Sequence, residues 1–186
     1  MEYFAVIDTE TNWENAVMSI GIVISEKNSF RNVYDLYFIF DPEYKVGGKF
    51  SDSLLVNGRK IENILLSRKE SMDKIKVVFK KYKVKDLFAY NASFDKHLLN
   101  EFSSYNWIDI MRIAAYRQYN HKIPINMECC STGRMKRNYG VENMIQLLSG
   151  NYSYMEIHNA LYDAMDELEI MRLLGKKFEE YSVAQI

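Results

Sequence analysis

The feature that most constrains the fold of this chain is a run of three strand-like segments near its start. Residues 3–8, YFAVID, form a short apolar stretch that ends in an acid, which is typical of a buried strand. Residues 17–25 and 30–40 are rich in β-branched and aromatic side chains and are separated by a polar turn. They predict an antiparallel hairpin beside the first strand.

Helix-like and strand-like segments alternate through the rest of the chain. Apolar residues at helical spacing predict a helix over about 60–82. The later segments follow in this order: a strand at 84–90, a helix after Asn91, a strand at 107–111, a helix around 112–119, a short amphipathic helix at 141–148 and a long helix at about 160–180. This order predicts an α/β fold in which a mixed five-stranded sheet is flanked by helices on both faces.

Length and composition predict one domain over residues 1–186. The chain is long enough for a full core, and 48% of its residues are hydrophobic. Its 14 tyrosines and 10 phenylalanines argue against an intrinsically disordered chain. The formal net charge of -1 excludes a polycation that binds DNA by charge alone. It does not exclude a nucleic-acid enzyme, because the carboxylates of a metal site lower the total charge.

The sequence also predicts the compartment. Its cysteines, Cys129 and Cys130, are adjacent and form no CxxC pattern, so neither a disulfide scaffold nor a zinc finger is expected. The N-terminus has no basic segment before an apolar stretch, and no apolar run approaches the roughly 18 residues needed to span a bilayer. We therefore expect a soluble protein in the reducing cytoplasm.

Acidic residues follow the predicted strands or begin a predicted helix. Asp8 closes the first strand, and Glu10 lies two positions later, so both side chains leave an extended chain on the same face. Asp95 follows the strand that ends at Tyr90, and Asp163 lies in the first turns of the last helix. Because reactive groups in α/β sheets gather at the edge where strands end, these four carboxylates are expected to converge.

Each acid alone has a simpler interpretation as a turn former or a helix cap, which is the expected role of Asp109. The set of four differs, because buried like charges repel one another unless metal ions neutralise them. Mg²⁺ and Mn²⁺ prefer oxygen ligands and keep positions open for phosphate oxygens. Two such ions about 4 Å apart stabilise the attacking and leaving oxygens of a phosphodiester displacement. The pattern therefore favours a metal site for phosphodiester chemistry.

Three motifs add a family resemblance to this pattern. They occur in the order DTET (8–11), NASFD (91–95) and HNALYD (158–163). In that order they resemble the three exonuclease motifs of the DEDDh (DnaQ-like) 3′→5′ exonucleases. IGIVI at 20–24 and IDIMRIA at 108–114 also resemble segments of that family, and the match extends over about residues 3–175. The resemblance implies a ribonuclease-H-like fold and a single exonuclease domain.

The resemblance also implies a role for each motif residue. Asp8, Glu10, Asp95 and Asp163 would be the four carboxylates that bind two divalent metal ions, Mg²⁺ or Mn²⁺. Asp8 would bridge both ions, while Glu10 and Asp163 would complete the ion on the nucleophile side. Asp95 would act near the second ion, partly through water. His158 would be the general base that takes a proton from the attacking water.

Some positions depart from the usual pattern of the family. Tyr90 replaces a histidine before the second motif, Asn12 and Trp13 replace a small loop after the first motif, and Ser19 replaces an acid or amide. None of these changes removes a metal ligand. They affect which substrate is expected, and they do not change the expectation of exonuclease activity.

The third motif can be interpreted in two ways. His158 and Asp163 fit an H-x4-D form, whereas Tyr162 and Asp166 fit the Y-x3-D form of a sister group. On a continuous helix His158 and Asp163 would lie roughly 140° apart, so His158 must precede the helix. Asn159 is a good N-cap, which places His158 on the loop and Asp163 in the first turns.

Periodicity along the last helix favours the histidine form. The stripe that continues from Asp163 passes through Glu167 to Ile170 and becomes apolar, so this side is expected to face the protein. The stripe that continues from Tyr162 is more polar. The remaining alternative is that this segment is an ordinary acidic helix and that His158 only forms hydrogen bonds within the protein.

Five further residues are candidates for substrate binding. Trp13 could stack on a terminal base, with a partly buried loop aromatic as the alternative. Thr11 could contact the terminal sugar of the substrate, and Asn91 of the second motif is also a candidate for substrate binding. Phe94 is more simply a core anchor for Asp95 than a base contact. Arg134 leads a basic cluster that could contact backbone phosphates.

The sequence favours a metal-dependent 3′→5′ exonuclease that acts on the 3′ ends of single-stranded DNA or RNA and releases nucleoside 5′-monophosphates. A proofreading subunit that binds a polymerase partner is an alternative, but little chain follows the last helix to serve as a polymerase-binding tail. A non-catalytic nucleic-acid-binding module is the alternative of a different class. The complete set of four acids and His158 argues against it. The choice between DNA and RNA stays open.

Overall fold

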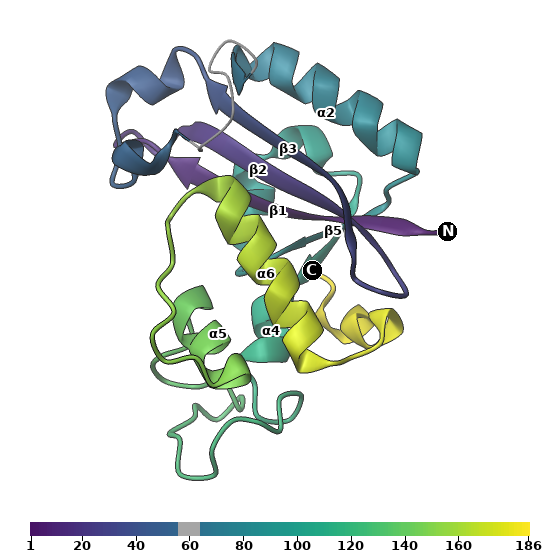
Figure 1. Cartoon of the computed structure of the whole chain (residues 1–186), viewed down its shortest axis with the longest axis vertical. Coiled ribbons are helices and arrows are strands. Elements are labelled where there is room, and N and C mark those ends of the chain that lie inside the picture. The colour runs from purple at the N-terminus through teal and green to yellow at the C-terminus, as the bar shows by residue number, and fades with distance from the viewer. Residues whose placement is uncertain (56–63) are drawn as a thin grey trace.

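The computed structural model describes residues 1–55 and 64–186. Within them, six strands form one mixed sheet with helices on both faces (Figure 1). The strands are β1 (Tyr3–Thr11), β2 (Val17–Glu26), β3 (Asn32–Phe40), β4 (Leu65–Leu66), β5 (Asp86–Ala89) and β6 (Asn106–Asp109). Their order in space is β4-β3-β2-β1-β5-β6. β1 pairs with β2 and β2 with β3 in antiparallel fashion, while the remaining pairs are parallel. The predicted hairpin and mixed sheet are confirmed.

The sheet has one strand more than the sequence predicted. The first residues of the helix predicted over 60–82 lie outside the described part of the chain. Further along the same predicted helix, Leu65–Leu66 instead form a short parallel edge strand. Helix α2 (Arg68–Tyr82) starts only after Ser67, whose hydroxyl accepts a hydrogen bond from the Glu70 N–H. The Glu70 carboxylate accepts one from the Ser67 N–H at 3.0 Å, which completes a capping box. Because this cap defines a helix start, the strand before it is a separate element.

The sheet divides the core into two layers, and each layer is covered by helices. α4 (Ile110–Ala114), α5 (Val141–Ser149) and α6 (Ala160–Leu174) cover one face of the sheet, and α2 and α3 (Ser93–Leu98) cover the other. Successive residues of β1 alternate between these layers, as the pleat of a strand requires. Phe4 and Val6 pack in the α6 layer, and Ala5 and Ile7 pack in the α2 layer. Asp8 and Glu10 follow in the same alternation, so their side chains lie on the side of β1 that faces α6.

Two predicted helices are shorter in the structure. The long helix expected over about 160–180 ends at Leu174, because Gly175 adopts a left-handed conformation with φ of 65° and closes it. A 3₁₀ segment over Phe178–Ala184 follows. The helix expected around 112–119 is confined to Ile110–Ala114, and Asp109 caps it as predicted by accepting a hydrogen bond from the Met111 N–H at 3.0 Å.

No helix in the part of the chain that the structure describes is long and apolar enough to cross a membrane. Cys129 and Cys130 are both free thiols. A cytoplasmic location stays a prediction.

Gly21 determines how closely α6 approaches the sheet. In β2 it is the residue opposite Asp8 of β1. A Cβ atom at this position would lie 2.1 Å from the carbonyl oxygen of Ala160 and 2.3 Å from the nitrogen of Leu161. Only glycine lets the first turn of α6 contact the strand backbone in this way. The contact brings Asp163, in the same turn, to the face of the sheet that carries Asp8.

We expect Gly21→Ala to destabilise the protein by about 1–3 kcal/mol, because the added methyl group forces the first turn of α6 away from β2. The shift should also lower activity, since it separates Asp163 from the acids of β1. Chemical denaturation measures the first effect. Gly140→Ala is the control, because a Cβ there meets no atom within 4 Å. Equal stability of both variants would contradict this account.

Candidate functional site

The acids of β1 and α6 meet at one place. Asp8 and Glu10 leave β1 on the face covered by α6, and Asp163 lies in the first turn of α6. One carboxylate oxygen from each of the three residues lies within 4.8 Å of the other two. Glu10 is 7% exposed and Asp163 is 5% exposed, so the cluster is largely shielded from solvent.

Asp95 joins this cluster from α3. Its side chain is buried, and Oδ1 accepts a hydrogen bond from the Thr9 hydroxyl at 2.7 Å. Thr9 lies between Asp8 and Glu10, so this bond ties α3 to the strand that carries them. The charge of Asp95 also acts directly on the Asp8 carboxyl. The structure therefore brings Asp8, Glu10 and Asp163 together, and it places Asp95 close enough for its charge to act on Asp8 and Glu10.

Burial and mutual repulsion make these acids difficult to ionise. Burial, then the charge of Asp95 and of three further acids, raises the pKa of Asp8 well above its ordinary value of 3.8. Burial is also the main cause that raises the pKa values of Glu10 and Asp95 to about 7. Burial, then the charge of Glu156, raises the pKa of Asp163 to about 9.

The residues fit a hard divalent cation. The donor set consists of carboxylate oxygens, which Mg²⁺ and Mn²⁺ prefer. Asp163 Oδ1 is buried and has no hydrogen-bond partner in residues 1–55 and 64–186. Among the described residues, none of the four acids forms an ion pair with a lysine, arginine or histidine. A bound cation would compensate the charge that the protein itself leaves uncompensated.

The raised pKa values predict how stability depends on pH. The folded protein binds the protons of Glu10, Asp95 and Asp163 more tightly than the unfolded chain, whose ordinary values are 3.8 and 4.5. Their contribution to stability is complete below about pH 4 and is lost as pH rises through about 7 and about 9. In EDTA we expect the melting temperature to fall by on the order of 5 °C between pH 6 and pH 9.

Excess Mg²⁺ should reverse most of that fall, because the ion replaces the protons as the compensating charge. Thermal unfolding across this pH range, with and without Mg²⁺, makes the comparison. A melting temperature that rises with pH in EDTA would show that the acids are not held in the protonated form.

His158 lies just before α6, at the edge of the acid cluster. Asn159 is the N-cap of α6, and its side-chain oxygen accepts a hydrogen bond from the Leu161 N–H at 3.1 Å. His158 itself has a positive φ of 57°, which takes its side chain out of the helical path. Its ring stacks on Phe50 with centroids 4.2 Å apart, and Nδ1 lies 3.8 Å from Glu156 Oε2. As predicted, His158 belongs to the loop and Asp163 to the helix.

The other pair of the third motif lies apart from the acids of β1. The Asp166 carboxylate accepts a hydrogen bond from the Tyr154 hydroxyl. Tyr162 and Asp166 are both partly exposed, whereas Asp163 and Glu167 are buried. The structure places Asp163, and not Asp166, with Asp8 and Glu10. This geometry favours the histidine form of the motif.

Two candidate substrate-binding residues lie next to β1. Thr11 is its last residue and is partly buried, and Trp13 follows in the loop with 69% of its surface exposed. The backbone N–H of Trp13 donates to the Gly47 carbonyl at 2.9 Å. The alternative of a partly buried loop aromatic is therefore wrong for Trp13, which is held by its backbone while its indole faces solvent.

The second motif presents an exposed aromatic residue as well. Phe94 is 48% exposed, so the expectation that it anchors Asp95 in the core is wrong. Asp95 is instead fixed by its own burial and by Thr9. Asn91 is also exposed and has a positive φ of 64°, and its backbone N–H donates to Asp109 Oδ1 at 3.0 Å. Asp109 thus orders the turn that carries the motif.

Arg134 is partly buried in the segment between α4 and α5. Its guanidinium lies over the ring of Tyr139, 4.9 Å from the centroid. Tyr139 in turn accepts a hydrogen bond, through its carbonyl oxygen, from the Tyr90 hydroxyl. This chain of contacts connects Arg134 to the end of β5 but places no atom of Arg134 among the acids.

Sequence reasoning missed several neighbours of the acids and of His158. Phe50, Lys49 and Glu156 surround His158 from loops, and no local pattern marks them. Glu167 lies one turn after Asp163 and is 1% exposed. Its place on the inward stripe of α6 was visible in the sequence, but the stripe was interpreted only as apolar.

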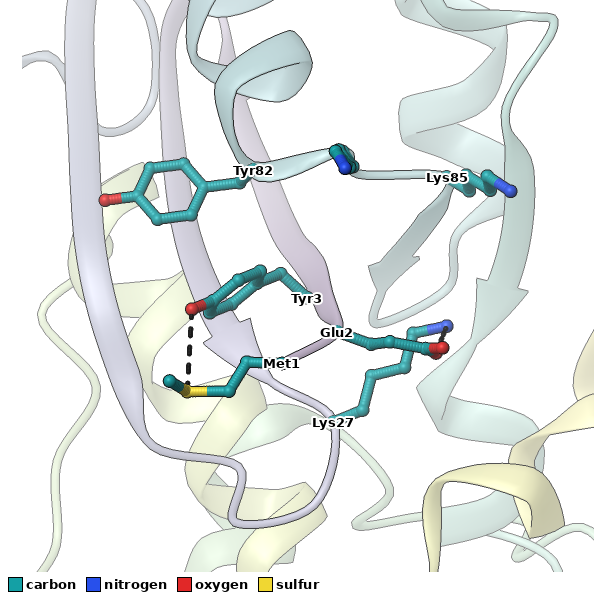
Figure 2. Close-up of a pocket in the computed structure, with 7 residues that line it drawn as sticks. Met1, Glu2, Tyr3, Lys27, Tyr82 and Lys85 are labelled. Carbon is teal, nitrogen blue, oxygen red and sulfur yellow. Dashed lines mark hydrogen bonds and ion pairs between the residues drawn. The ribbon is translucent and has the colours of Figure 1, made fainter.

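A surface pocket lies at the opposite end of β1 (Figure 2). It has a volume of about 220 Å³ and is lined by Met1, Glu2, Tyr3, Lys27, Tyr82, Lys83 and Lys85. Lys27 is paired with Glu2 at 3.4 Å and with Asp86 at 2.8 Å. Because β1 starts at this pocket and ends at the acids, the pocket is separate from the candidate site.

Comparisons with known proteins identify the fold. No family model matches the chain, and no curated protein matches it. Solved structures do: the nuclease domain of 3'hExo, a DEDDh family member bound to rAMP, matches with a TM-score of 0.63 and 18% identity over 94% of this chain and 92% of that chain. A 3'-exonuclease that recognises the 3'-end of a histone mRNA stem-loop has a TM-score of 0.64 and 15% identity over 95% of this chain.

E. coli Exonuclease I in complex with a dT13 oligonucleotide has a TM-score of 0.65 and 13% identity over 97% of this chain. This chain spans 65% of the stem-loop-binding exonuclease and 42% of Exonuclease I. The architecture is thus that of the ribonuclease-H-like α/β nucleases. More narrowly, the chain has the fold of the DEDDh 3′-exonucleases, and the predicted resemblance is confirmed at the level of the fold.

Proposed function

We propose that this protein is a metal-dependent 3′→5′ exonuclease. It hydrolyses phosphodiester bonds at the 3′ ends of single-stranded DNA or RNA and releases nucleoside 5′-monophosphates. The observation that carries the proposal is the convergence of acids from β1, α3 and α6 beside a histidine on the loop before α6. A cytoplasmic location is part of the proposal, supported by the free thiols of Cys129 and Cys130.

Asp8, Glu10, Asp95 and Asp163 would hold two divalent ions, Mg²⁺ or Mn²⁺. When bound, such ions supply a Lewis acid for the phosphate and stabilise the charge on the attacking and leaving oxygens. The acids themselves fix where this chemistry occurs. Asp8 is the central residue of the set, because its carboxyl interacts with the charges of Asp95, Asp163 and Glu10 together.

His158 is the proposed general base. Partial burial, and then the charge of Lys49, lowers the pKa of its imidazole, so the ring is neutral at pH 7 and can accept a proton from water. Stacking on Phe50 holds the ring plane. Glu156 lies 3.8 Å from Nδ1, and the charge of Glu142 favours the imidazolium that forms when the proton is taken.

The proposed substrate is a nucleic-acid strand with a free 3′ end. Trp13 and Phe94 present exposed aromatic faces on which bases of any sequence can stack. Thr11 and Asn91 would lie near the terminal nucleotide, and Arg134 would contact a phosphate of the strand. The solved neighbours bound to rAMP and to a dT13 oligonucleotide support this class of substrate. We do not favour a polymerase partner.

Digestion of 5′-labelled single-stranded DNA and RNA with Mn²⁺ tests the proposal. We expect a ladder of products that shortens from the 3′ end and disappears in EDTA. Comparing the two substrates settles the preference between DNA and RNA. Strand binding with no ladder on either substrate would contradict the exonuclease and would support a non-catalytic binding module.

A further inference from the structure

Glu167 is a fifth buried acid on the side of α6 that faces β1. It lies one helical turn after Asp163 and is 1% exposed. Its Oε2 atom is buried and has no hydrogen-bond partner among the described residues. Within that part of the chain it also forms no ion pair with a lysine, arginine or histidine. Glu167 thus has a carboxylate oxygen that the protein itself leaves without a partner.

The neighbours of Glu167 make this arrangement unfavourable for the protein alone. Burial, and then the charge of Asp95, raises the pKa of Glu167 well above its ordinary value, and the charge of Glu167 in turn raises the pKa of Asp8. The adjacent inward residues, Ala164 and Leu168, are apolar and buried. An uncharged side chain would therefore suit this position better if only packing mattered. The position instead carries an acid.

The backbone that leads into the second motif also acts on Glu167. The backbone N–H of Tyr90 lowers the pKa of the Glu167 carboxyl, against the larger effect of burial. Tyr90 follows β5 and immediately precedes Asn91, in the turn that leads to Asp95. Glu167 therefore links the helix that carries Asp163 to the turn that carries Asp95.

We propose that Glu167 is a positioning residue of the metal centre, and that its unpartnered oxygen accepts a hydrogen bond from a water molecule on a divalent cation held by the four acids. The inference rests on the proposed function, because it requires that these acids bind a cation. It extends that function by assigning a fifth carboxylate, outside the three motifs, to metal affinity. Residues that orient metal ligands in this way commonly change metal affinity by about 10–100-fold when they are replaced.

Glu167→Gln tests the proposal, because it keeps the size of the side chain and an oxygen for the Tyr90 N–H while it removes the charge. Calorimetric titration of the protein of residues 1–186 with Mn²⁺, in the absence of nucleic acid, should show binding weaker by about 10–100-fold. The melting temperature in EDTA should be unchanged or higher, since one repelling carboxylate is gone. Glu167→Asp keeps the charge on a shorter side chain and should recover part of the affinity, even if the amide variant folds poorly.

Glu169→Gln is the matched control, because it makes the same change on the same helix at a residue that pairs with Arg172 at 3.1 Å. Its affinity for Mn²⁺ should equal that of the wild type. Wild-type affinity in Glu167→Gln, or a wild-type protein that does not bind Mn²⁺, would overturn the inference. A wild-type protein that binds Mn²⁺ but produces no ladder would refute the proposed function and leave the result for Glu167 standing.

Discussion

Asp8→Ala is expected to abolish exonuclease activity and to remove measurable binding of Mn²⁺ together. Asp8 is the acid on which the charges of all the others act, so without it the remaining carboxylates no longer share one cation. The apo protein should remain folded, and its melting temperature in EDTA should be equal to or above that of the wild type. The physical reason is that the loss of one of several neighbouring like charges removes repulsion. Ladder assays, calorimetry and thermal unfolding measure the three effects.

Asp166→Asn is the control for this prediction, since it changes another acid of α6, whose carboxylate accepts a hydrogen bond from the Tyr154 hydroxyl. It should keep nearly full activity, while Asp163→Asn should lose it. If Asp163→Asn were as active as the wild type and Asp166→Asn were inactive, the assignment of the helix ligand would be reversed. Metal binding by Asp8→Ala at wild-type affinity would place the cation elsewhere.

His158→Ala is expected to lower turnover by roughly 10²–10⁴-fold while binding of Mn²⁺ largely survives. The alanine removes the proton acceptor but leaves the four acids in place. Loss of turnover without loss of metal affinity therefore separates the general base from the metal ligands. Single-turnover digestion with saturating Mn²⁺, together with calorimetry, measures both quantities.

His121→Ala serves as the matched control, because His121 is exposed and lies outside the cluster. It should not change turnover. An equal loss in both histidine variants, or a loss of Mn²⁺ binding in His158→Ala that accounts for the lower rate, would contradict the role of His158 as a base.

The sequence predicted elements correctly where local chemistry defines them. Asp109 and Asn159 were expected to cap helices, and each accepts a hydrogen bond from the first turn of its helix. The capping box of Ser67 and Glu70 was also readable, yet the apolar spacing on either side of Ser67 suggested one continuous helix. The strand of two residues before it has no periodicity of its own, because its pairing with β3 depends on residues far away in the chain.

The aromatic residues show the same difference between what local sequence patterns predict and what distant contacts decide. Phe94 was expected to be a core anchor for Asp95, but in α3 the position next to that buried acid points outward and Phe94 is 48% exposed. Phe50 had no assigned role, because its contact with His158 joins two loops that are about a hundred residues apart. Solvent exposure and long-range stacking are properties of the folded chain, and a single segment does not encode them.

By itself the sequence determined which acids and which histidine are available, and the strands and helix starts that carry them, because caps and strand patterns depend on neighbouring residues. Only the tertiary structure decided that Asp8, Glu10 and Asp163 share one site, and that Glu167 lies buried beside them. Gly21 shows the physical reason. The missing side chain of one glycine in β2 allows α6 to contact the sheet, and the distance between acids far apart in the sequence follows from that contact.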